Sequence, residues 1–337
     1  MGGDRAPQIV IEGADIVASK REDAHFSFFG DRDKILPIIQ NCRYLKNRYV
    51  ITHTTESITA DEKPSNAVRR LPNSSMKLAI KSVKEQKNDA IVSAGNTGAL
   101  MAISQVILRP LDLINRPAIV STIPNQKGTG TVMLDLGANL ECGEEVLYQF
   151  AIMGHAFARI VHRLENPKVG LLNVGSEDKK GHESLHNVSE MLKESHIKED
   201  FYGFVEGDDI TKGTVDVIVT DGFTGNIMLK TVEGTVKFIG ELIKEGFTAT
   251  IFSKIGYLFA GPSLTRVTKT VDPRAHNGAM LVGLNEVVVK SHGSTDRIGF
   301  SNAINVAISL VEHKINEKII EEINSSNEKN NKTKDTA

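Results

Sequence analysis

The stretch "DAIVSAGNTG", residues 89–98, joins an apolar run to a turn with a glycine on either side of Asn96 and Thr97. The chain repeats this pattern as "DVIVTDGFTG", residues 216–225, with six of the ten positions identical. Each copy predicts a buried strand, a glycine-dependent tight turn and the start of a helix. A strand that leads straight into a helix is typical of α/β proteins, so the repeat predicts that fold class.

Apolar runs alternate with helical patterns along most of the chain. Helices are expected over 74–86 and 144–164, where apolar residues are three and four apart. Strands apolar on both faces and separated by helices predict a mainly parallel sheet with helices on both faces. We expect a single α/β unit over 1–324 and a polar, disordered tail over 325–337. Besides the two copies, strands are expected in "AHFSFFG" (24–30), "RYVITHT" (48–54), "RPAIVSTI" (116–123), "TVMLDLG" (131–137), "KVGLLNVG" (168–175) and "EVVVKSHG" (286–293).

Composition excludes several classes of protein. The 40 basic and 42 acidic residues give a net charge of -2, which provides no general attraction for nucleic acid. The two cysteines, Cys42 and Cys142, lack the paired spacing of a zinc or redox motif, which favours a reducing cytoplasm. No apolar run approaches the roughly 18 to 20 residues that span a bilayer, and the N-terminus lacks the pattern of a signal peptide. A soluble protein, or one that lies on a membrane surface, is expected.

Both repeated turns are candidate anion sites. The first N–H groups of a helix have no partner within the helix, and that end carries a partial positive charge. Thr97 and Thr224 add a hydroxyl each, and Asn96 and Asn226 can donate an amide N–H. Two such turns facing one cleft would suit a phosphate and a developing oxyanion, or two parts of one phosphorylated substrate. The alternative is that these side chains only cap the helices.

Other candidates occur in one copy or outside the repeat. Asp221, where the first copy has Ala94, would orient a donor, handle a proton or cap the turn. His292 is a candidate general acid or base, although a lone histidine is more often structural. Cations for a phosphate are expected among Lys63, Arg69, Lys127 and Lys180.

Sharper catalytic motifs are absent from the sequence. It contains no G-x-G-x-x-G after a first strand, no G-x-x-x-x-G-K-[ST], no G-x-S-x-G and no H-E-x-x-H. With neither a serine elbow nor a convincing cysteine nucleophile, direct attack by a bound nucleophile is favoured over covalent catalysis.

Taken together, the motifs resemble those of the bacterial acyl-[acyl-carrier-protein]:phosphate acyltransferases of phospholipid synthesis. The resemblance runs in order from residue 1 to about 312. It rests on "MGGD", "DEKPSNAVRRLPNSSM", "SAGNTGALM", "NRPAI", "LDLGAN", "QFAIMG", "NPKVGLLNVGSEDKKG", "VEGDDI", "DGFTGNIMLKTVEG" and "KSHGS".

The resemblance implies reversible transfer of a fatty acyl group from acyl carrier protein to inorganic phosphate, without nucleotide, redox cofactor or metal. The product would be an acyl phosphate for a membrane glycerol-3-phosphate acyltransferase. It also implies a homodimer, a fold similar to phosphate acetyltransferases and isopropylmalate dehydrogenases, and a cytoplasmic protein peripherally associated with the inner face of the cell membrane.

Our mechanistic hypothesis assigns roles to the candidate residues within this reaction. Phosphate would bind the turn formed by Ser93, Asn96, Thr97 and Gly98, with charge from Lys180 or Lys63. Asp221, Thr224, Gly225 and Asn226 would meet the thioester carbonyl, or hold phosphate from the other side. Further substrate contacts are expected from Asp4, Gly95, Asn139 and Gly222, with His292 among the catalytic residues.

The sequence departs from the family pattern at two places. Family members usually begin with a strand directly before "MGGD", whereas this chain begins at that motif's methionine. Either the start was placed too late, with the first strand missing upstream of Met1, or the sheet lacks a strand beside the site. His182 in "SEDKKGHE" stands where asparagine is usual, which questions the contacts of that loop but not Lys180.

The stretch 241–264 predicts one amphipathic helix. Ile243, Phe247, Ile251, Ile255 and Phe259 are four residues apart, with Leu258 beside them. The pattern alone is equally consistent with a core or dimer-contact helix. The resemblance favours a helical tip, paired in the dimer, that touches the membrane through Phe247, Ile251, Ile255, Leu258 and Phe259.

Three rival functions remain at this stage. A phosphate acetyltransferase that uses a short acyl-CoA would need the same phosphate site. A decarboxylating dehydrogenase on the same fold would need several carboxylates for a divalent metal and a nicotinamide site. A non-catalytic scaffold at the membrane surface is the third.

Overall fold

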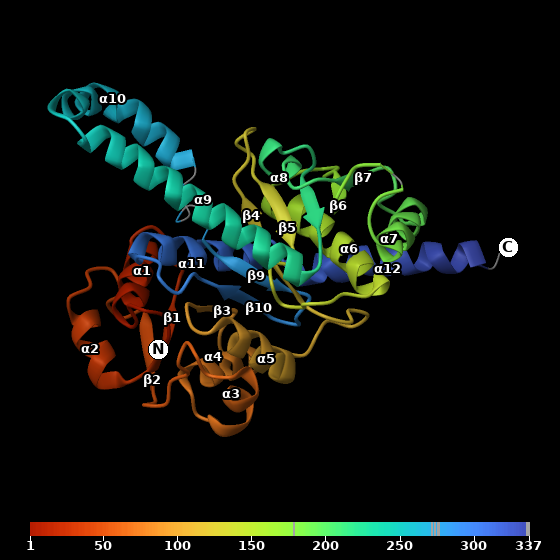
Figure 1. Ribbon diagram of the computed structural model, residues 1–337. Helices are drawn as coiled ribbons and strands as arrows, with labels where there is room; N and C mark the ends of the chain where they lie inside the picture. The colour runs from red at the N-terminus through yellow and green to blue at the C-terminus, as the bar shows by residue number, and fades with distance from the viewer. Residues whose placement is uncertain (178, 271, 273, 275–276, 335–337) are drawn as a thin grey trace.

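A sheet of eight strands, covered by helices on both faces, forms the centre of the described part of the chain (Figure 1). The computed structural model describes residues 1–337 except 178, 271, 273, 275–276 and 335–337, and it leaves out the side chains of 262, 265–270 and 326–334. The strand order is β3-β10-β9-β4-β5-β8-β6-β7. These strands are β3 (Ala90–Ser93), β4 (Ala118–Ile123), β5 (Thr131–Leu134), β6 (Val169–Leu172), β7 (Phe201–Val205), β8 (Val217–Val219), β9 (Ala279–Val282) and β10 (Val287–Lys290).

The predicted α/β class is confirmed, and the sheet is mixed rather than purely parallel. β9 runs antiparallel to both β10 and β4, and β4 runs antiparallel to β5, whereas the other pairings are parallel. Every predicted apolar run contains a strand. The first two, β1 (Phe26–Gly30) and β2 (Tyr49–His53), form a separate parallel pair instead of joining the large sheet. The sequence prediction missed β7 and β9, because "FYGFV" is interrupted by Gly203 and "AMLV" is too short to be distinguished from a helix.

Two apolar cores lie on the two faces of the sheet. One contains α6 (Glu144–Val161), α7 (Glu183–Glu194), α11 (Arg297–Glu312) and α12 (Ile315–Lys334). The other contains α3 (Pro64–Arg70), α4 (Ser75–Lys84), α5 (Thr97–Leu108), α8 (Asp209–Lys212) and the start of α9 (Gly222–Thr248). A third core joins α1 (Gln8–Ala18) and α2 (Arg32–Gln40) to β1 and α11.

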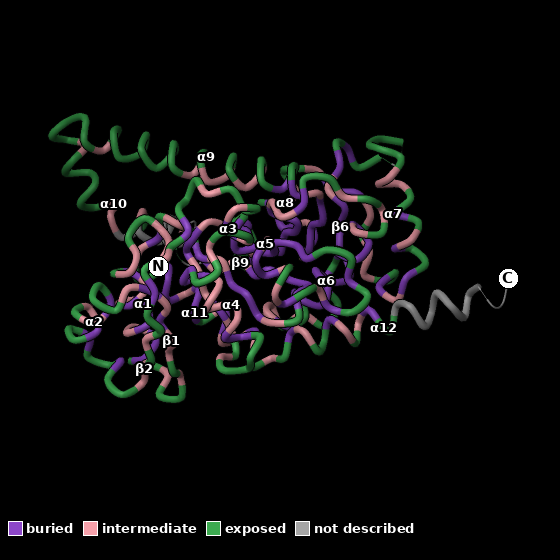
Figure 2. The backbone as a smooth tube through the Cα atoms, turned by 90° about the horizontal axis from the view of Figure 1, so that it is seen from below, coloured by how far each residue is buried: buried purple, intermediate pink, exposed green. Residues whose placement is uncertain are grey.

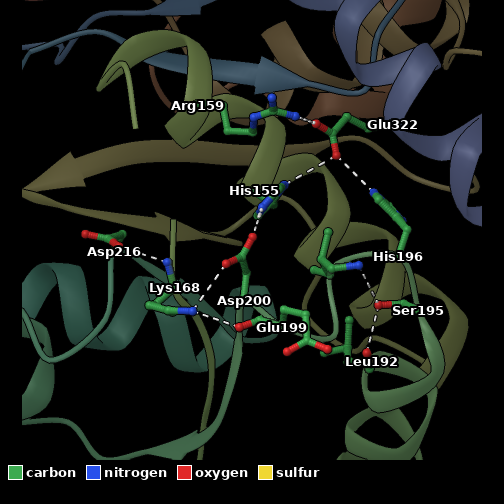
Figure 3. Close-up of polar contacts among 11 residues, drawn as sticks. His155, Arg159, Lys168, Leu192, Ser195, His196, Glu199, Asp200, Asp216 and Glu322 are labelled. Atoms are coloured by element: carbon green, nitrogen blue, oxygen red, sulfur yellow. Dashed lines mark hydrogen bonds and ion pairs between the residues drawn. The ribbon is translucent and has the colours of Figure 1, made fainter. Parts of the chain in front are cut away.

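A largely buried charge cluster fastens α12 to α6 (Figure 3). Glu322 of α12 accepts from His196 at 3.0 Å, pairs with Arg159, and faces Nδ1 of His155 at 3.3 Å, while Nε2 of His155 faces Asp200 at 3.1 Å. Burial alone would raise the pKa of Glu322, but the contacts from the two histidines and the arginine lower it well below its usual range. This cluster therefore stabilises the packing of the C-terminal helix.

A cavity of about 450 Å³ separates the β1–β2 pair from β3. It is a slot between two strand edges, since all of β3 and residues 26–29 of β1 line it. At one end of the slot the Met1 ammonium group donates to the Phe29 carbonyl at 3.1 Å, and burial lowers its pKa to about 6.

The predicted single helix over 241–264 is wrong, because the chain turns back and forms a helical hairpin. The helix α9 (Gly222–Thr248) ends before α10 (Ile251–Thr270), and the two pack side by side, with the rings of Phe247 and Tyr257 5.5 Å apart. The hairpin projects from the body of the protein, and its outer part is largely exposed (Figures 1 and 2). No helix in the described residues is long and apolar enough to cross a membrane.

The C-terminal segment also differs from the expectation of a disordered tail from residue 325. The helix α12 continues to Lys334, and residues 335–337 lie outside the described part. The helix packs against α6, and the last turns, which are rich in Glu, Lys and Asn, continue the same helix.

Candidate active site

The two repeated turns do not face each other across one edge of the sheet, so this part of the sequence prediction is wrong. Three antiparallel pairings separate β3 from β8 in the strand order, and these two strands therefore point in opposite directions. The turn after β3 therefore lies at one end of the strands, and the turn after β8 lies at the opposite end. The helix α9 joins the two regions, because it begins at Gly222 and runs along the sheet toward the end of β10 (Figure 1).

The first region, at the ends of β3 and β10, gathers three segments that the sequence singled out. A Cβ atom on Gly2 would meet the Gly95 backbone at 3.0 Å, and one on Gly3 would meet Ala94 at 2.9 Å. The Asp4 N–H donates to the carbonyl of Gly293 at 3.0 Å. "MGGD", the first turn and the "KSHG" segment are thus in direct contact, as the predictions for Asp4, Gly95 and His292 require.

The side-chain oxygen and the amide group of Asn96 both form hydrogen bonds within the protein. Its side-chain oxygen accepts from the Ala99 N–H at 2.9 Å and caps α5, while its amide donates to carbonyls of Ala60 at 2.8 Å and Glu62 at 3.0 Å. These bonds fasten the loop before α3 to the start of α5. Asn96 therefore has a capping and positioning function here. Its predicted role as a hydrogen-bond donor to phosphate stays untested.

The other residues of the first turn leave room for a ligand. Thr97 is exposed, and among the described residues no side chain or carbonyl bonds its hydroxyl. Gly98 is exposed beside the ring of Pro64, and the Ser93 hydroxyl accepts from the Gly95 N–H at 3.2 Å. Lys63 caps α3 next to this turn and is exposed. The N-terminal end of α5 can thus receive an anion.

Charged side chains of β10 and α9 flank the first turn. Lys290 ends β10, and burial, together with the nearby positive charge of Lys230 on α9, lowers its pKa to about 8 despite the carboxylate of Asp4. His292 faces Glu233 of α9 at 4.0 Å through Nε2. Its Nδ1 accepts from the Ser294 N–H at 3.3 Å, so the neutral ring carries its proton on Nε2.

In the second region, close packing explains why glycines are needed. Asp221 caps α9 by accepting from the Thr224 N–H at 2.8 Å and from the Thr224 hydroxyl at 2.9 Å. The Gly222 N–H donates to the Asn139 carbonyl at 2.7 Å, and a Cβ on Gly225 would lie 1.9 Å from the Asp135 carbonyl oxygen. Asn226 is exposed and lies beside Gly137. The start of α9 is therefore pressed against the turn after β5.

Asp135 organises that neighbouring turn. It is fully buried and accepts from the backbone N–H groups of Ile119, Gly137, Ala138 and Asn139 at 2.7 to 3.2 Å. Burial raises the pKa of Asp135, against the lowering effect of these donors. The Asn139 amide donates to Asp135 at 3.0 Å and to the Pro117 carbonyl at 2.8 Å, so its contacts are also internal.

Lys180 belongs to the edge of the second region and not to the first turn. It follows β6, which runs parallel to β8, and its ammonium pairs with Glu177 at 3.0 Å. The side chain is about half exposed. His182 caps the start of α7 and is exposed. The predicted partnership of Lys180 with phosphate on the first turn is therefore wrong within one chain, while that of Lys63 stays a prediction.

The sequence prediction missed four charged residues that the fold places in these regions. They are Asp135, Lys230, Glu233 and Lys290. "DLGAN" and "KSHG" offered a signal, because a charged residue that ends an apolar strand points to a site at the sheet edge. Lys230 and Glu233 gave none, since nothing in the pattern of α9 shows which face meets β10.

Solved structures share the fold. A phosphotransacetylase from Streptococcus pyogenes superposes with a TM-score of 0.63 over 91% of this chain and 92% of that chain, at 14% identity. A branched-chain phosphotransacylase from Enterococcus faecalis V583 gives a TM-score of 0.53 over 92% and 97%, also at 14% identity. Fold and site together define an α/β protein of the phosphotransacetylase fold, with a candidate anion site at a helix N-terminus.

Sequence relatives define the family more narrowly. The chain matches the model of the fatty acid synthesis protein family over residues 1–318. It is 49% identical over 322 residues to the phosphate acyltransferase of Paramagnetospirillum magneticum, covering 96% of this chain and 92% of the relative. With the same enzyme of Rhodospirillum centenum it shares 50% over 323 residues, covering 96% and 91%. The chain belongs to this family and is a phosphate acyltransferase.

Proposed function

We propose that the protein transfers a fatty acyl group reversibly from acyl carrier protein to inorganic phosphate, producing an acyl phosphate for phospholipid synthesis. A phosphate oxygen attacks the thioester carbonyl carbon, a C–O bond forms as the C–S bond breaks, and the carrier thiolate leaves and takes a proton. The attacking hydrogen phosphate loses its proton as the C–O bond forms, and this proton is the one that the thiolate takes. His292 is the side chain that we propose transfers it. No covalent acyl-enzyme is needed.

The open first turn is the observation that carries this proposal. Phosphate sits on Ser93, Thr97 and Gly98 at the start of α5, where among the described residues the N–H groups of Thr97 and Gly98 and the Thr97 hydroxyl lack internal partners. Asp4, Gly95 and His292 border the same place. The second turn fixes the start of α9, and Asp221, Thr224 and Asn226 act on the thioester from that helix end.

The donor test compares two thioesters of one acyl chain. Acyl phosphate formation is measured with inorganic phosphate and either palmitoyl-acyl carrier protein or palmitoyl-CoA as the donor. We expect kcat/KM to be higher for the carrier protein thioester. Equal or better use of the CoA thioester would favour the rival with a short acyl-CoA and overturn this assignment.

Exposed apolar residues on the hairpin support two further proposals. Phe252, Leu258 and Phe259 are 86%, 77% and 83% exposed, which is costly in water unless a surface covers them. We propose that this end touches the membrane, placing the enzyme on the inner face next to the downstream acyltransferase. Flotation with anionic liposomes tests it: Ile251→Glu with Phe259→Glu should abolish binding, and unchanged binding would contradict the proposal.

The inner part of the same hairpin supports a homodimer. Phe238, Ile239, Leu242 and Ile243 of α9 are exposed beyond the body of the protein. A second copy of the chain would cover this strip. Sedimentation should give a dimer that Leu242→Glu with Ile243→Glu converts to a monomer, and a monomeric parent protein would refute it.

A further inference from the structure

Lys290 lies next to the first turn in the register of the sheet. In the parallel pairing of β10 with β3, Lys290 stands opposite Ser93, and the Ser291 N–H donates to the Ser93 carbonyl at 2.8 Å. Side chains alternate along a strand, so Lys290 shares the face of Val288, and Ser93 shares the face of Ile91. Val288 and Ile91 both belong to the core that contains α4 and α5. The Lys290 ammonium group is therefore on the same side of the sheet as the start of α5.

The helix α9 brings a second lysine to this place. Met228 and Leu229 pack against the same core, and Lys230 follows directly. Its ammonium pairs with Glu233 at 2.7 Å, and Glu233 in turn faces His292. The Lys290 ammonium donates to the carbonyl of Ser291, and its other two protons have no acceptor among the described residues.

We infer that Lys290 and Lys230 form the cationic wall of the phosphate site, with Lys290 as the residue that contacts the phosphate oxygens and Lys230 as its long-range support. The inference rests on the proposed function and adds residues to it. Two neighbouring ammonium groups of which one is partly buried repel each other, and a dianion placed between them and the α5 N-terminus relieves that repulsion. The lowered pKa of Lys290 agrees with this arrangement.

The position predicts a selectivity for phosphate over water as acyl acceptor. An oxyanion held by a partly buried ammonium and by helix N–H groups is oriented toward the thioester, whereas a water molecule has no charge to be held there. Asp4, on the other side, limits the net positive charge when no anion is bound.

The test measures KM for inorganic phosphate in acyl phosphate formation, together with binding of inorganic phosphate alone by isothermal calorimetry. Lys290→Met should raise KM and Kd for phosphate at least about tenfold, since a hydrogen bond to a charged group contributes about 1.5 to 3 kcal/mol. KM for the acyl donor should change less than about twofold. Lys237→Met, on the same helix two turns beyond Lys230, is the matched control and should change neither constant.

The variant Lys290→Arg separates an effect of the positive charge on phosphate binding from an effect of the substitution on folding. It keeps the positive charge, and its guanidinium stays protonated over the whole accessible pH range. In the parent enzyme the affinity for phosphate should fall as the pH rises above about 8, where Lys290 loses its proton beside Lys230, Asp4, Glu233 and His292. In Lys290→Arg this fall should be absent.

The outcomes distinguish this inference from the proposed function. If the parent enzyme makes no acyl phosphate and binds no phosphate, the proposed function fails. If the parent does both but a folded Lys290→Met keeps KM and Kd for phosphate within twofold, the inference about Lys290 is wrong and the proposed function stands.

Discussion

The two Gly-x-Thr-Gly turns are nearly identical in sequence and differ in what surrounds them. The helix α5 begins at Thr97, whereas α9 begins at Gly222, two positions earlier in the repeat, because Asp221 caps it there and the first copy has Ala94 instead. The first turn is left open at its start, and the second is pressed against the Asp135 turn. The comparison shows that one strand-turn-helix pattern can form a binding site at one place and a tightly packed contact between two turns at another.

The last glycine of each copy should respond most differently. In Gly225→Ala the new Cβ would lie 1.9 Å from the Asp135 carbonyl, whereas in Gly98→Ala its nearest neighbour is the flexible ring of Pro64 at 2.9 Å. We expect Gly225→Ala to destabilise the protein by about 3 kcal/mol or more and Gly98→Ala by less than about 1 kcal/mol. Urea unfolding monitored by circular dichroism measures both. Equal losses in the free energy of unfolding would show that the two turns are packed alike and would contradict the comparison.

The buried amino group of Met1 belongs to the first region only. In the folded protein its pKa is about 6, below the value of about 8 in an unfolded chain, so between pH 8 and pH 6 the unfolded chain binds the extra proton. Stability should therefore fall as the pH decreases from 8 to 6, by about 2 kcal/mol at most. A version with an acetylated Met1 amine lacks this titrating group.

In the acetylated version the decrease between pH 8 and pH 6 should disappear, as measured by urea unfolding at both pH values. An acetylated version with the same decrease would contradict the assignment of this pH dependence to the Met1 amine.

The caps of the two helices should have smaller and separable effects. Asp221→Ala and Asn96→Ala each remove one cap and should cost about 1 kcal/mol. Asn96→Ala also releases the loop of Ala60 and Glu62, so it should raise KM for phosphate as well, whereas Asp221→Ala should leave that constant within twofold. Steady-state kinetics beside thermal unfolding checks this. A larger rise in KM for Asp221→Ala would assign phosphate to the second turn.

Much of the fold follows from local patterns, and the arrangement of the site does not. The repeat predicted both strands and both helix starts, because apolar runs and glycine turns are local signals. The relative direction of β3 and β8 depends on β9, a four-residue strand late in the chain, and no local signal shows its antiparallel pairing. The predicted helix over 241–264 failed similarly, since periodicity does not reveal that the chain reverses at Ala249 and Thr250.

The site residues divide in the same manner. Ser93, Gly95, Thr97 and His292 were predicted because small and polar residues follow strands, whereas Asp4 was predicted together with the family resemblance; their roles stay predictions. Lys230 and Lys290 meet only through the path of α9 across the sheet, which is a property of the tertiary structure.

The equivalent threonines test the division of labour most directly. Thr97 has a free hydroxyl among the described residues, whereas the Thr224 hydroxyl is bonded to Asp221. Steady-state kinetics should show that Thr97→Val raises KM for inorganic phosphate about tenfold or more, the loss of one hydrogen bond to a charged group. Thr224→Val should leave it within twofold. The opposite pattern, with KM raised by Thr224→Val and unchanged by Thr97→Val, would contradict the account.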